Sequence, residues 1–492
     1  MAKQHSEIIS AGLPWPPTDD LPRINRQKLY RTMFNQSEPS LLVRGVEWKS
    51  KPVETFTSAF VKMVSISYAN LLVGEQVGLS IEGPGKQDEA TTAMKRIARG
   101  SGFGIVAFNA CIGQSVEGRH YIKLRRGKKT SRSKTDEVMI ENLWAQNVIR
   151  FTDPGSSIAL GFCIWQELCI QKEKFIQFEI HYQGEIWHEL WSIQGDVLKE
   201  KVNFEAVLGY LPIGITDPLG GMQETGVDDL LVFEIDNIPT NGWSIPDLHG
   251  SENVVRLLED RLSRDSEILN KHASPKLAVP TGVLDDKGQV SRQTWDGMVF
   301  QVDPGSNLFV PEYITWDPKV EQSFTYWDKL LGVLLANTGL THQIVGFESK
   351  DGFADSGTAL RLRMIPTLAM VNAKRLNLSP AFTNSFRAAL ALADGFGDYG
   401  STALDHAHDV VAGWRDGIPE DPIESATVSS IKTGARQTMS IRRSIRINNP
   451  DMTEEMIDAE LSAIQAEEQA SLPNGGARAG RTVALNLAAD QQ

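Results

Sequence analysis

The residues best suited to metal chemistry lie in one short run, Asp405-His406-Ala407-His408-Asp409. Imidazole nitrogens and carboxylate oxygens are ligands that zinc accepts. In an extended segment, His406 and His408 would share one face, because successive side chains alternate. The same residue types suit a solvated turn equally well, and we interpret the run as a surface turn. We therefore expect no metal site and no cofactor.

The sequence lacks the common catalytic signatures. There is no Gly-x-x-x-x-Gly-Lys-Ser/Thr phosphate loop, no His-Glu-x-x-His and no Gly-x-Ser-x-Gly. Gly100, Gly102 and Gly104 precede a predicted strand instead of joining a strand to a helix, which argues against a dinucleotide site. We expect a protein that is not an enzyme. The alternative is a multi-lobed hydrolase with carboxylates on a tryptophan-rich β lobe.

A basic segment from residue 125 to 134 stands out in an acidic chain. Its cations are Arg125, Arg126, Lys128, Lys129, Arg132 and Lys134. We interpret the segment first as the solvated tip of a hairpin. A second interpretation is a contact with an anionic partner, such as DNA, a scaffold protein or an acidic neighbouring subunit.

Composition limits the class of protein. A chain of 492 residues exceeds what one core usually supports, so several lobes are expected. The net charge of −13 argues against tight binding through phosphate contacts, although DNA could still slide past such a surface. Cys111, Cys163 and Cys169 are too few for a disulfide framework, and we expect buried free thiols. Neither a membrane-spanning run nor a signal-peptide core is apparent, so we expect a cytoplasmic protein without membrane contact.

Two helices with clear boundary signals organise the second half of the chain, at residues 251–272 and 317–339. Ser251 suits the N-cap of the first helix. In the second, Asp317 and Pro318 suit the start and Gly339 suits the end. Its apolar residues recur at steps of four and three, which is typical of helices packed nearly parallel to neighbours. This predicted seam is Val320, Phe324, Trp327, Leu331 and Leu334.

A glycine-containing loop from residue 341 to 355 follows the second helix. Its larger side chains are His342, Gln343, Phe347, Lys350 and Phe353. A third helix begins near Ser356, and Pro366 and Pro380 should kink or break it because each removes a backbone donor.

The first half of the chain is predicted to be rich in strands. Proline frequency predicts an extended arm over residues 1–50, followed by helices at 53–73 and 87–98. Strands are predicted at 105–112, 121–124, 137–144, 159–170, 175–182 and 185–192, with a hairpin turn at Gln183-Gly184. We expect residues 410–414 to add a strand to this sheet, and residues 425–432 and 454–468 to be helical. The fold class is α+β.

Several segments occur in an order shared with a known family. They are Gly250-Ser251-Glu252-Asn253-Val254-Val255 with Leu257-Leu258-Glu259-Asp260, Ser274-Pro275-Lys276-Leu277, the Asp317 helix, Ser356-Gly357-Thr358-Ala359-Leu360, Pro419-Glu420-Asp421, Ser440, and Pro450-Asp451-Met452-Thr453-Glu454-Glu455. In this order the chain resembles the portal protein, or head–tail connector, of long-tailed bacteriophages. The resemblance covers roughly the second half, and no residue of the first half carries it.

The resemblance implies a domain plan. It places an N-terminal arm at 1–50, the first part of a β-rich wing at 51–250, the first stem helix at 251–272, a small β clip at 273–316, the second stem helix at 317–339, a channel loop at 340–355, a kinked helix returning to the wing at 356–415, an α-helical crown at 416–470 and a mobile tail at 471–492.

The resemblance also implies a function. Such proteins form a ring of about twelve copies at one capsid vertex, through which double-stranded DNA is packaged and ejected. Terminase, major capsid or scaffold protein, and head-completion and tail proteins would be the partners. The loop residues would line the channel, with Lys350 meeting phosphate and no base being read. The protein would be assembled in the host bacterial cytoplasm and end in the virion.

Overall fold

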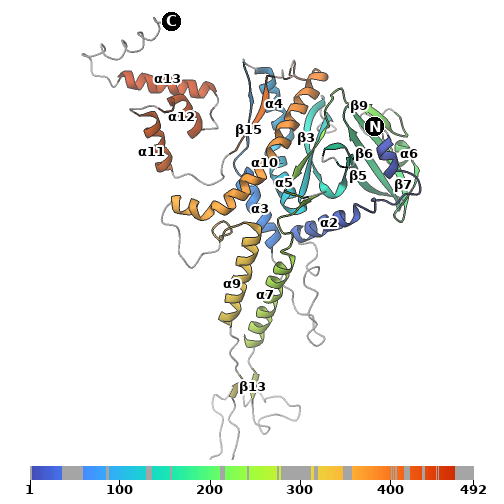
Figure 1. Ribbon diagram of the computed structural model, residues 1–492, viewed down its shortest axis with the longest axis horizontal. Coiled ribbons are helices and arrows are strands. Elements are labelled where there is room, and N and C mark those ends of the chain that lie inside the picture. The colour runs from blue at the N-terminus through green and yellow to red at the C-terminus, as the bar shows by residue number, and fades with distance from the viewer. Residues whose placement is uncertain are drawn as a thin grey trace, which may run out of the picture. The chain divides into compact units, whose positions relative to one another are not determined.

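The computed structural model describes residues 3–35, 59–84, 88–128, 136–153, 155, 158–210, 217–240, 243–273, 276–278, 312–314, 320–346, 357–400, 402, 404, 407–414, 422–434, 438–449, 452 and 454–470. The chain forms two compact units, residues 1–417 and 418–492. Helices and sheets are mixed, as Figure 1 shows, which confirms the predicted α+β class.

A six-stranded antiparallel sheet forms the largest β structure of the first unit. Its order is β4 (Val148–Thr152), β5 (Ala159–Ile170), β6 (Glu173–Tyr182), β7 (Glu185–Gln194) and β8 (Val197–Lys201), with β9 (Gly221–Glu224) also paired to β7. The predicted hairpin turn is confirmed, because Tyr182 pairs with Glu185 and Gly184 adopts a φ of 79°. The predicted strands of this region are confirmed with small differences in their ends.

A second sheet has the order β10 (Val232–Asp236), β2 (Arg119–Lys128) and β3 (Asp136–Trp144). Its Tyr121 and Val232 pack against Phe162 of the larger sheet. Strand β15 (Asp409–Gly413) pairs with β1 (Gly78–Glu82) in a separate two-stranded sheet. The expectation that residues 410–414 join the predicted sheet is therefore wrong, since their partner is an early strand that we did not predict. Short strands β11 (Ile238–Pro239) and β12 (Ser244–Ile245) form a further pair.

Three helices line the body: α3 (Phe60–Val73), α4 (Asp88–Ser101) and α5 (Phe103–Glu117). The predicted strand at 105–112 is wrong, because these residues form α5. Its residues are buried from Ala110 to Glu117 without a break, so no polar stripe marks the helical period. Gly113 is required by a close contact, since a Cβ there would lie 2.1 Å from Nδ1 of His120.

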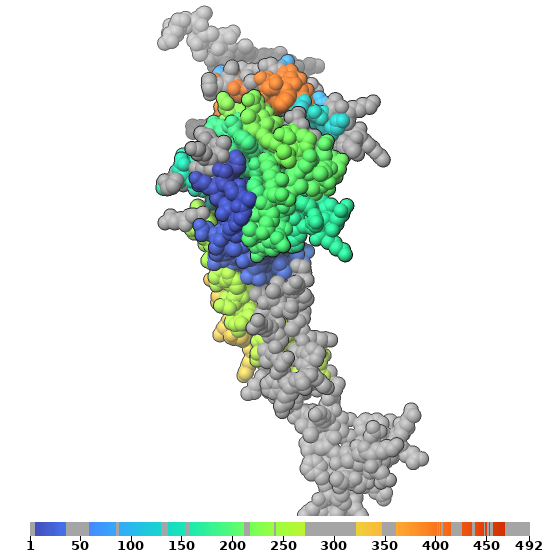
Figure 2. All heavy atoms as spheres, turned by 90° about the vertical axis from the view of Figure 1, so that its right-hand side faces the viewer, coloured from blue at the N-terminus to red at the C-terminus, as the bar shows by residue number. Residues whose placement is uncertain are grey.

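The N-terminal segment is helical and packs on its own chain, contrary to the predicted extended arm. Its helices are α1 (Lys3–Ile8) and α2 (Leu21–Asn35). Pro22 is tolerated because it lies in the first turn of α2, where its missing N–H has no helical acceptor. Ile9, Trp15 and Ile24 enter the core on one face of the six-stranded sheet. Figure 2 shows the blue N-terminal segment lying against the green strands.

Helices α7 (Glu252–Ala273) and α9 (Val320–Thr338) form an antiparallel pair that extends from the body (Figure 1). Both predicted helices are thereby confirmed as helices. Beyond α7, β13 (Lys276–Ala278) pairs with β14 (Glu312–Ile314). The remaining residues of the predicted clip lie outside the described residues.

Helix α10 (Gly357–Gly395) continues through both Pro366 and Pro380. The prolines therefore do not break it, and Figure 1 shows that the helix bends along its length. No helix in the described part of the chain is long and apolar enough to cross a membrane.

The second unit contains α11 (Pro422–Thr433), α12 (Ile441–Asn448) and α13 (Glu454–Ala470), which confirms both helices predicted there. Ser440 caps α12, since its Oγ accepts a hydrogen bond from the Arg443 amide at 3.2 Å. Arg442 and Asp458 join α12 to α13 at 2.9 Å.

Candidate functional site

The antiparallel pair of α7 and α9, which we call the stem after the predicted domain plan, has an interface that the predicted seam describes only in part. Leu331 and Leu334 are buried, as predicted. Trp327 is partly buried, with its ring 6.5 Å from that of Phe60. Phe324 remains 53% exposed, so its predicted contact with an adjacent subunit stays a prediction. The side chain of Val320 lies outside the described residues.

Buried polar contacts join the two stem helices. The Arg261 guanidinium donates to Ser323 Oγ at 2.6 Å, and that hydroxyl donates to the Asp265 carboxylate. Arg261 and Asp265 also form an ion pair at 3.4 Å. Because a slide along the helix axis would separate Ser323 from both Arg261 and Asp265, this cluster favours one register of α7 against α9.

The outward sides of the stem helices carry large apolar residues that the single chain does not cover. Tyr326 and Val333 of α9 are each 48% exposed, and Leu257 of α7 is 39% exposed. Single exposed apolar residues are common on soluble proteins. Here they recur on both helices of a projecting pair, which is typical of a surface that meets another subunit.

A buried cluster joins the stem to the body. We call it the joint and define it as Tyr68, Asn237, Asp247, Thr338, Gly339 and Lys374. Lys374 of α10 is 3% exposed and donates to both oxygens of Asp247, at 2.7 and 2.9 Å. It also donates to the Asn237 side chain and lies 4.6 Å from the centre of the Tyr68 ring. The ammonium therefore has a partner for each of its three protons.

The end of α9 is held by the same cluster. Helix α9 stops at Gly339, which has a φ of 72°, and the Leu340 amide donates back to the Leu335 carbonyl at 3.0 Å. Tyr68 donates its hydroxyl proton to the Thr338 carbonyl. Thr367 of α10 donates to the Gly339 carbonyl at 2.8 Å. The predicted role of Gly339 as the helix end is thus confirmed.

The start of α7 is fixed at the same place. The Asp247 amide donates to the Ser115 carbonyl of α5 at 3.0 Å. Asn337 of α9 donates to Ser251 Oγ at 3.2 Å, which links the first residues of α7 to the last turn of α9. Burial, and then the Asp247 carboxylate, raise the pKa of Tyr68 well above its ordinary value, so its hydroxyl stays protonated. Both stem helices therefore leave the body from a fixed point.

The described part of the predicted channel loop is a short turn. Its Ile344 amide donates to the Thr341 carbonyl at 3.1 Å, and Gly346 has a φ of 76°. His342 and Gln343 are half-buried in this turn. Phe347, Lys350 and Phe353 lie outside the described residues. Their contact with DNA stays a prediction.

The basic segment is not a solvated tip over its whole length, because Arg125, Arg126 and Lys128 belong to strand β2. Arg125 pairs with Glu141 at 2.8 Å. Arg126 donates to both oxygens of Asp398, at 2.8 and 2.9 Å. These two arginines therefore have carboxylate partners within the chain. Lys129, Arg132 and Lys134 lie outside the described residues.

The histidine run is only partly described. His408 is buried, and Asp405 and His406 lie outside the described residues. Within the described ranges, no three or more histidine, cysteine or acidic side chains gather as a metal site would require. The expectation of buried thiols is right for Cys111 and Cys163 and wrong for Cys169, which is exposed. Burial raises the pKa of the Cys111 thiol to about 12.

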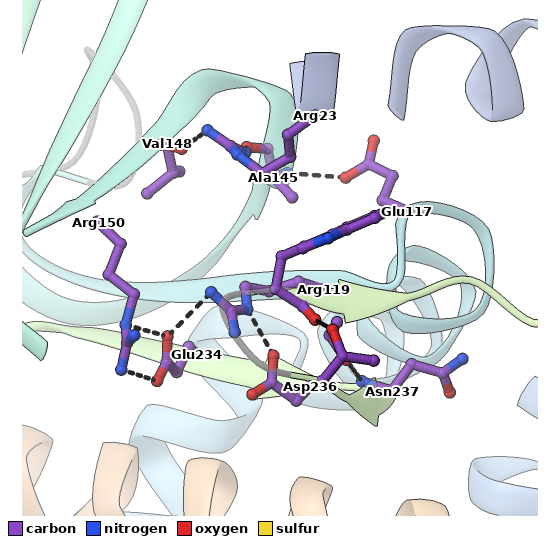
Figure 3. A network of polar contacts seen from close by, with 12 residues as sticks. Arg23, Glu117, Arg119, Ala145, Val148, Arg150, Glu234, Asp236 and Asn237 are labelled. Carbon is purple, nitrogen blue, oxygen red and sulfur yellow. Dashed lines mark hydrogen bonds and ion pairs between the residues drawn. The ribbon is translucent and has the colours of Figure 1, made fainter. Parts of the chain in front are cut away.

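A network that we did not predict fastens the N-terminal helix to the body (Figure 3). Glu117 is fully buried and accepts hydrogen bonds from Arg31 at 2.7 Å and from the Ala145 amide at 2.7 Å. Arg23 donates to the carbonyls of Ala145 and Val148 at 3.1 Å. Burial raises the pKa of Glu117 even with Arg31 beside it. Helix α2 is thereby held against β4 and the end of α5.

The same view shows a second part of the network. Glu234 pairs with Arg150 at 3.0 Å, and Arg119 pairs with Asp236 at 2.5 Å. Tyr30 of α2 donates to Glu252 in the first turn of α7. The N-terminal helix therefore contacts the stem as well as the sheet. Helical periodicity could have indicated α2, but its partners lie far away in the sequence.

The hydrolase alternative would need carboxylates facing a substrate on the tryptophan-rich sheet. Glu185 instead accepts a hydrogen bond from Trp187 at 3.2 Å. Glu189 accepts one from Trp191 at 2.8 Å and pairs with Lys201 at 3.1 Å. Both carboxylates have partners within the chain that explain their positions.

The comparison with solved structures finds chains of phage-like particles. One belongs to the virion of a native gene transfer agent particle, with 12% identity over 89% of this chain and 95% of that chain and a TM-score of 0.42. Another belongs to the neck of a native gene transfer agent particle computed with C12 symmetry, with 10% identity over 90% and 97% and a TM-score of 0.40. No protein-family model and no curated protein matches the sequence. Since a TM-score below 0.5 leaves even the shared fold open, the functional proposal rests on the contacts of this chain.

Proposed function

We propose that this chain is the subunit of a ring-shaped portal, a non-enzymatic channel at one capsid vertex. The observation that carries the proposal is the stem. Its two helices are joined by hydrogen bonds among Arg261, Ser323 and Asp265 and are held to the body by the joint. Yet Leu257, Tyr326 and Val333 are left exposed on its outer sides. A projecting pair with uncovered apolar sides favours contact with neighbours, and a repeated contact whose rotation divides a full turn would close the copies into a ring.

The order of the segments along the chain supports a more detailed assignment of roles to them. The stem would surround the axis, and the segment after Gly339 would face the channel, with Lys350 close to passing phosphates. The clip, residues 273–316, would bind the packaging motor and then the head-completion adaptor. About twelve copies would assemble in the host bacterial cytoplasm and become part of the virion. The net charge of −13 per chain suits a wall along which DNA slides.

Native mass measurement and negative-stain imaging test the assembly. We expect rings with a central hole for the wild-type chain, and loss of at least about tenfold of the ring population for Val333→Asp, because a carboxylate would be buried between subunits. Thr325→Asp is the matched control, since Thr325 is an exposed polar residue of the same helix. The thermal midpoint of the Val333→Asp monomer should stay close to that of the control. A wild-type chain that remains monomeric at all concentrations would contradict the proposal.

A further inference from the structure

A concave groove of about 550 Å³ lies on the first unit, where α3 ends and α5 begins. Its walls come from the end of α3, from strand β1, from one side of α4 and from the first turns of α5. A volume of this size is in the range of pockets that bind ligands. We call it the groove, and the apolar residues that line it include Val73, Leu79, Met94, Ala98, Phe103 and Ile105.

The apolar lining of the groove is partly open to solvent. Ile105 of α5 is 72% exposed, although it lies only two residues after the buried Phe103. Leu79 of β1 and Ala98 of α4 are half-buried on two other walls. An exposed apolar hollow of this kind can take a large apolar side chain of a partner, which is the usual arrangement at the centre of a binding interface.

The charges of the groove all have one sign. Lys95 and Arg99 of α4 line it, and no acidic residue does so among the described residues. The two cations lie four residues apart and therefore on one side of the helix. Both are exposed, and neither has a carboxylate partner within the part of the chain that the structure describes. They are therefore available to the carboxylates of a partner.

The start of α5 adds to the positive potential. Its N-cap is Gly102, so no side chain there accepts a hydrogen bond from the amides of the first turn. The dipole of the helix also favours negative charge at this end. Gly102, Phe103 and Gly104 all line the groove. A carboxylate held by Lys95 or Arg99 would thus meet a second source of attraction.

Strand β1 favours an extended peptide over a small molecule. It contributes Leu79 to the groove, and in the described ranges it pairs with β15 alone. Its second edge therefore has backbone donors and acceptors that an added segment can use.

We propose that the groove binds an acidic segment of another protein, in which a large apolar side chain lies between carboxylates. The apolar side chain fills the groove, and the carboxylates pair with Lys95 and Arg99. Over the rest of a chain with a net charge of −13, an acidic segment is repelled on average, so the attraction is local. Duplex DNA fits poorly, because two cations beside an apolar lining offer few phosphate contacts. The inference concerns the single chain and goes beyond the proposed ring.

Three fluorescein-labelled peptides test the chemistry of the partner on the full-length chain. The first is Ser-Asp-Glu-Leu-Phe-Glu-Asp-Ser. The second replaces Leu-Phe with Ser-Ser, and the third replaces the acids with the matching amides. By fluorescence anisotropy, we expect the first to bind at least about tenfold more tightly than the others, because each of these lacks one part of the recognition. Equal affinity for all three peptides, or no binding of the first, would overturn the inference.

Charge substitutions locate the binding site. Arg99→Glu should weaken binding of the first peptide at least about tenfold, and Arg99→Gln should weaken it less, because the amide removes attraction without adding repulsion. Lys62→Glu is the matched control, since Lys62 is an exposed cation of α3 that does not line the groove. Its affinity should equal that of the wild type. An equal loss in Lys62→Glu and Arg99→Glu would show that net charge sets the affinity, and would overturn the inference.

Filling the groove tests the apolar contact. Ala98→Phe should abolish the difference in affinity between the first and second peptides, and circular dichroism shows whether this variant is folded. A labelled DNA duplex that binds the wild type and is lost in Arg99→Glu would identify a nucleic acid as the partner and overturn the inference. A chain that binds the first peptide through Arg99 but forms no ring would contradict the proposed function and leave this inference standing.

Discussion

The six-stranded sheet and the stem differ in what covers their apolar faces. One face of the sheet is sealed by Ile9, Trp15 and Ile24 from the same chain, and the other packs on Tyr121 and Val232. The stem keeps large apolar side chains exposed. One region is therefore complete in a single chain, whereas the other would be completed by neighbouring copies in the proposed ring. Stability and assembly should therefore respond to different substitutions.

Trp15→Ala should have the largest effect on the stability of the single chain. Trp15 is 2% exposed, and its ring meets Phe178 edge-on at 4.5 Å and Trp165 at 5.9 Å. Removing a buried tryptophan side chain costs about 3–5 kcal/mol, since it leaves a cavity. Chemical denaturation of the single chain measures the loss. Loss of rings in Trp15→Ala under conditions where the chain stays folded would contradict the separation between stability and assembly.

Lys374→Met should have the next largest effect, because it removes the cation at the boundary between the two regions. Asp247 would remain buried without its charge partner, which costs about 3 kcal/mol or more. Denaturation monitored by circular dichroism gives the free energy of unfolding. The double variant Lys374→Met/Asp247→Leu removes both charges and should recover part of the loss. A single variant as stable as the wild type would show that the pair does not hold the joint.

A change of pH should have the smallest effect of the three on stability, and it should act within the single chain. Burial lowers the pKa of His120 from 6.5 to about 4, even though Nε2 contacts Asn142 Oδ1 at 2.9 Å. Below pH 6.5 the unfolded chain therefore binds a proton that the folded chain excludes. Stability should fall as the pH drops from 6.5 towards 4, by roughly 2 kcal/mol between pH 7 and pH 5 from this group.

Thermal unfolding of wild type and His120→Gln across this range isolates the contribution of His120. The stability of the variant should fall less steeply as the pH drops. Part of the fall should remain, because burial also lowers the pKa values of His5 and His188. The same difference should appear in single chains and in rings, because His120 is buried within one subunit. A parallel pH dependence in both proteins would exclude His120 as a source.

The parts of the fold that the sequence predicted correctly are those with local signals. Gly339 ends a helix because only a residue tolerant of positive φ suits that position. The strand before Gly184 alternates apolar Ile176, Phe178 and Ile180 with polar residues. Helix α5 was missed because burial on nearly all sides removes its polar face, and the N-terminal helix was missed because its prolines occupy turns and a first helical turn.

The parts that could not be predicted depend on partners far apart in the chain. Nothing near Lys374 in the sequence indicates Asp247, and nothing near Glu117 indicates Arg31. Phe324 shares the period of Leu331 and Leu334 but is exposed, since periodicity gives the face of a helix and not the length over which a partner covers it.

The position of α2 has a consequence for the order in which the chain can fold during synthesis. Residues 3–35 leave the ribosome before their partners, which include Val148, Leu198 and Glu252. These residues must therefore wait until the chain has been made as far as Glu252 before all of their contacts can form. During that interval the sheet face that Trp15 will cover is open to solvent, and a chaperone would bind there. Because Tyr30 donates to Glu252, α2 can complete its contacts only after the first turn of α7 has formed.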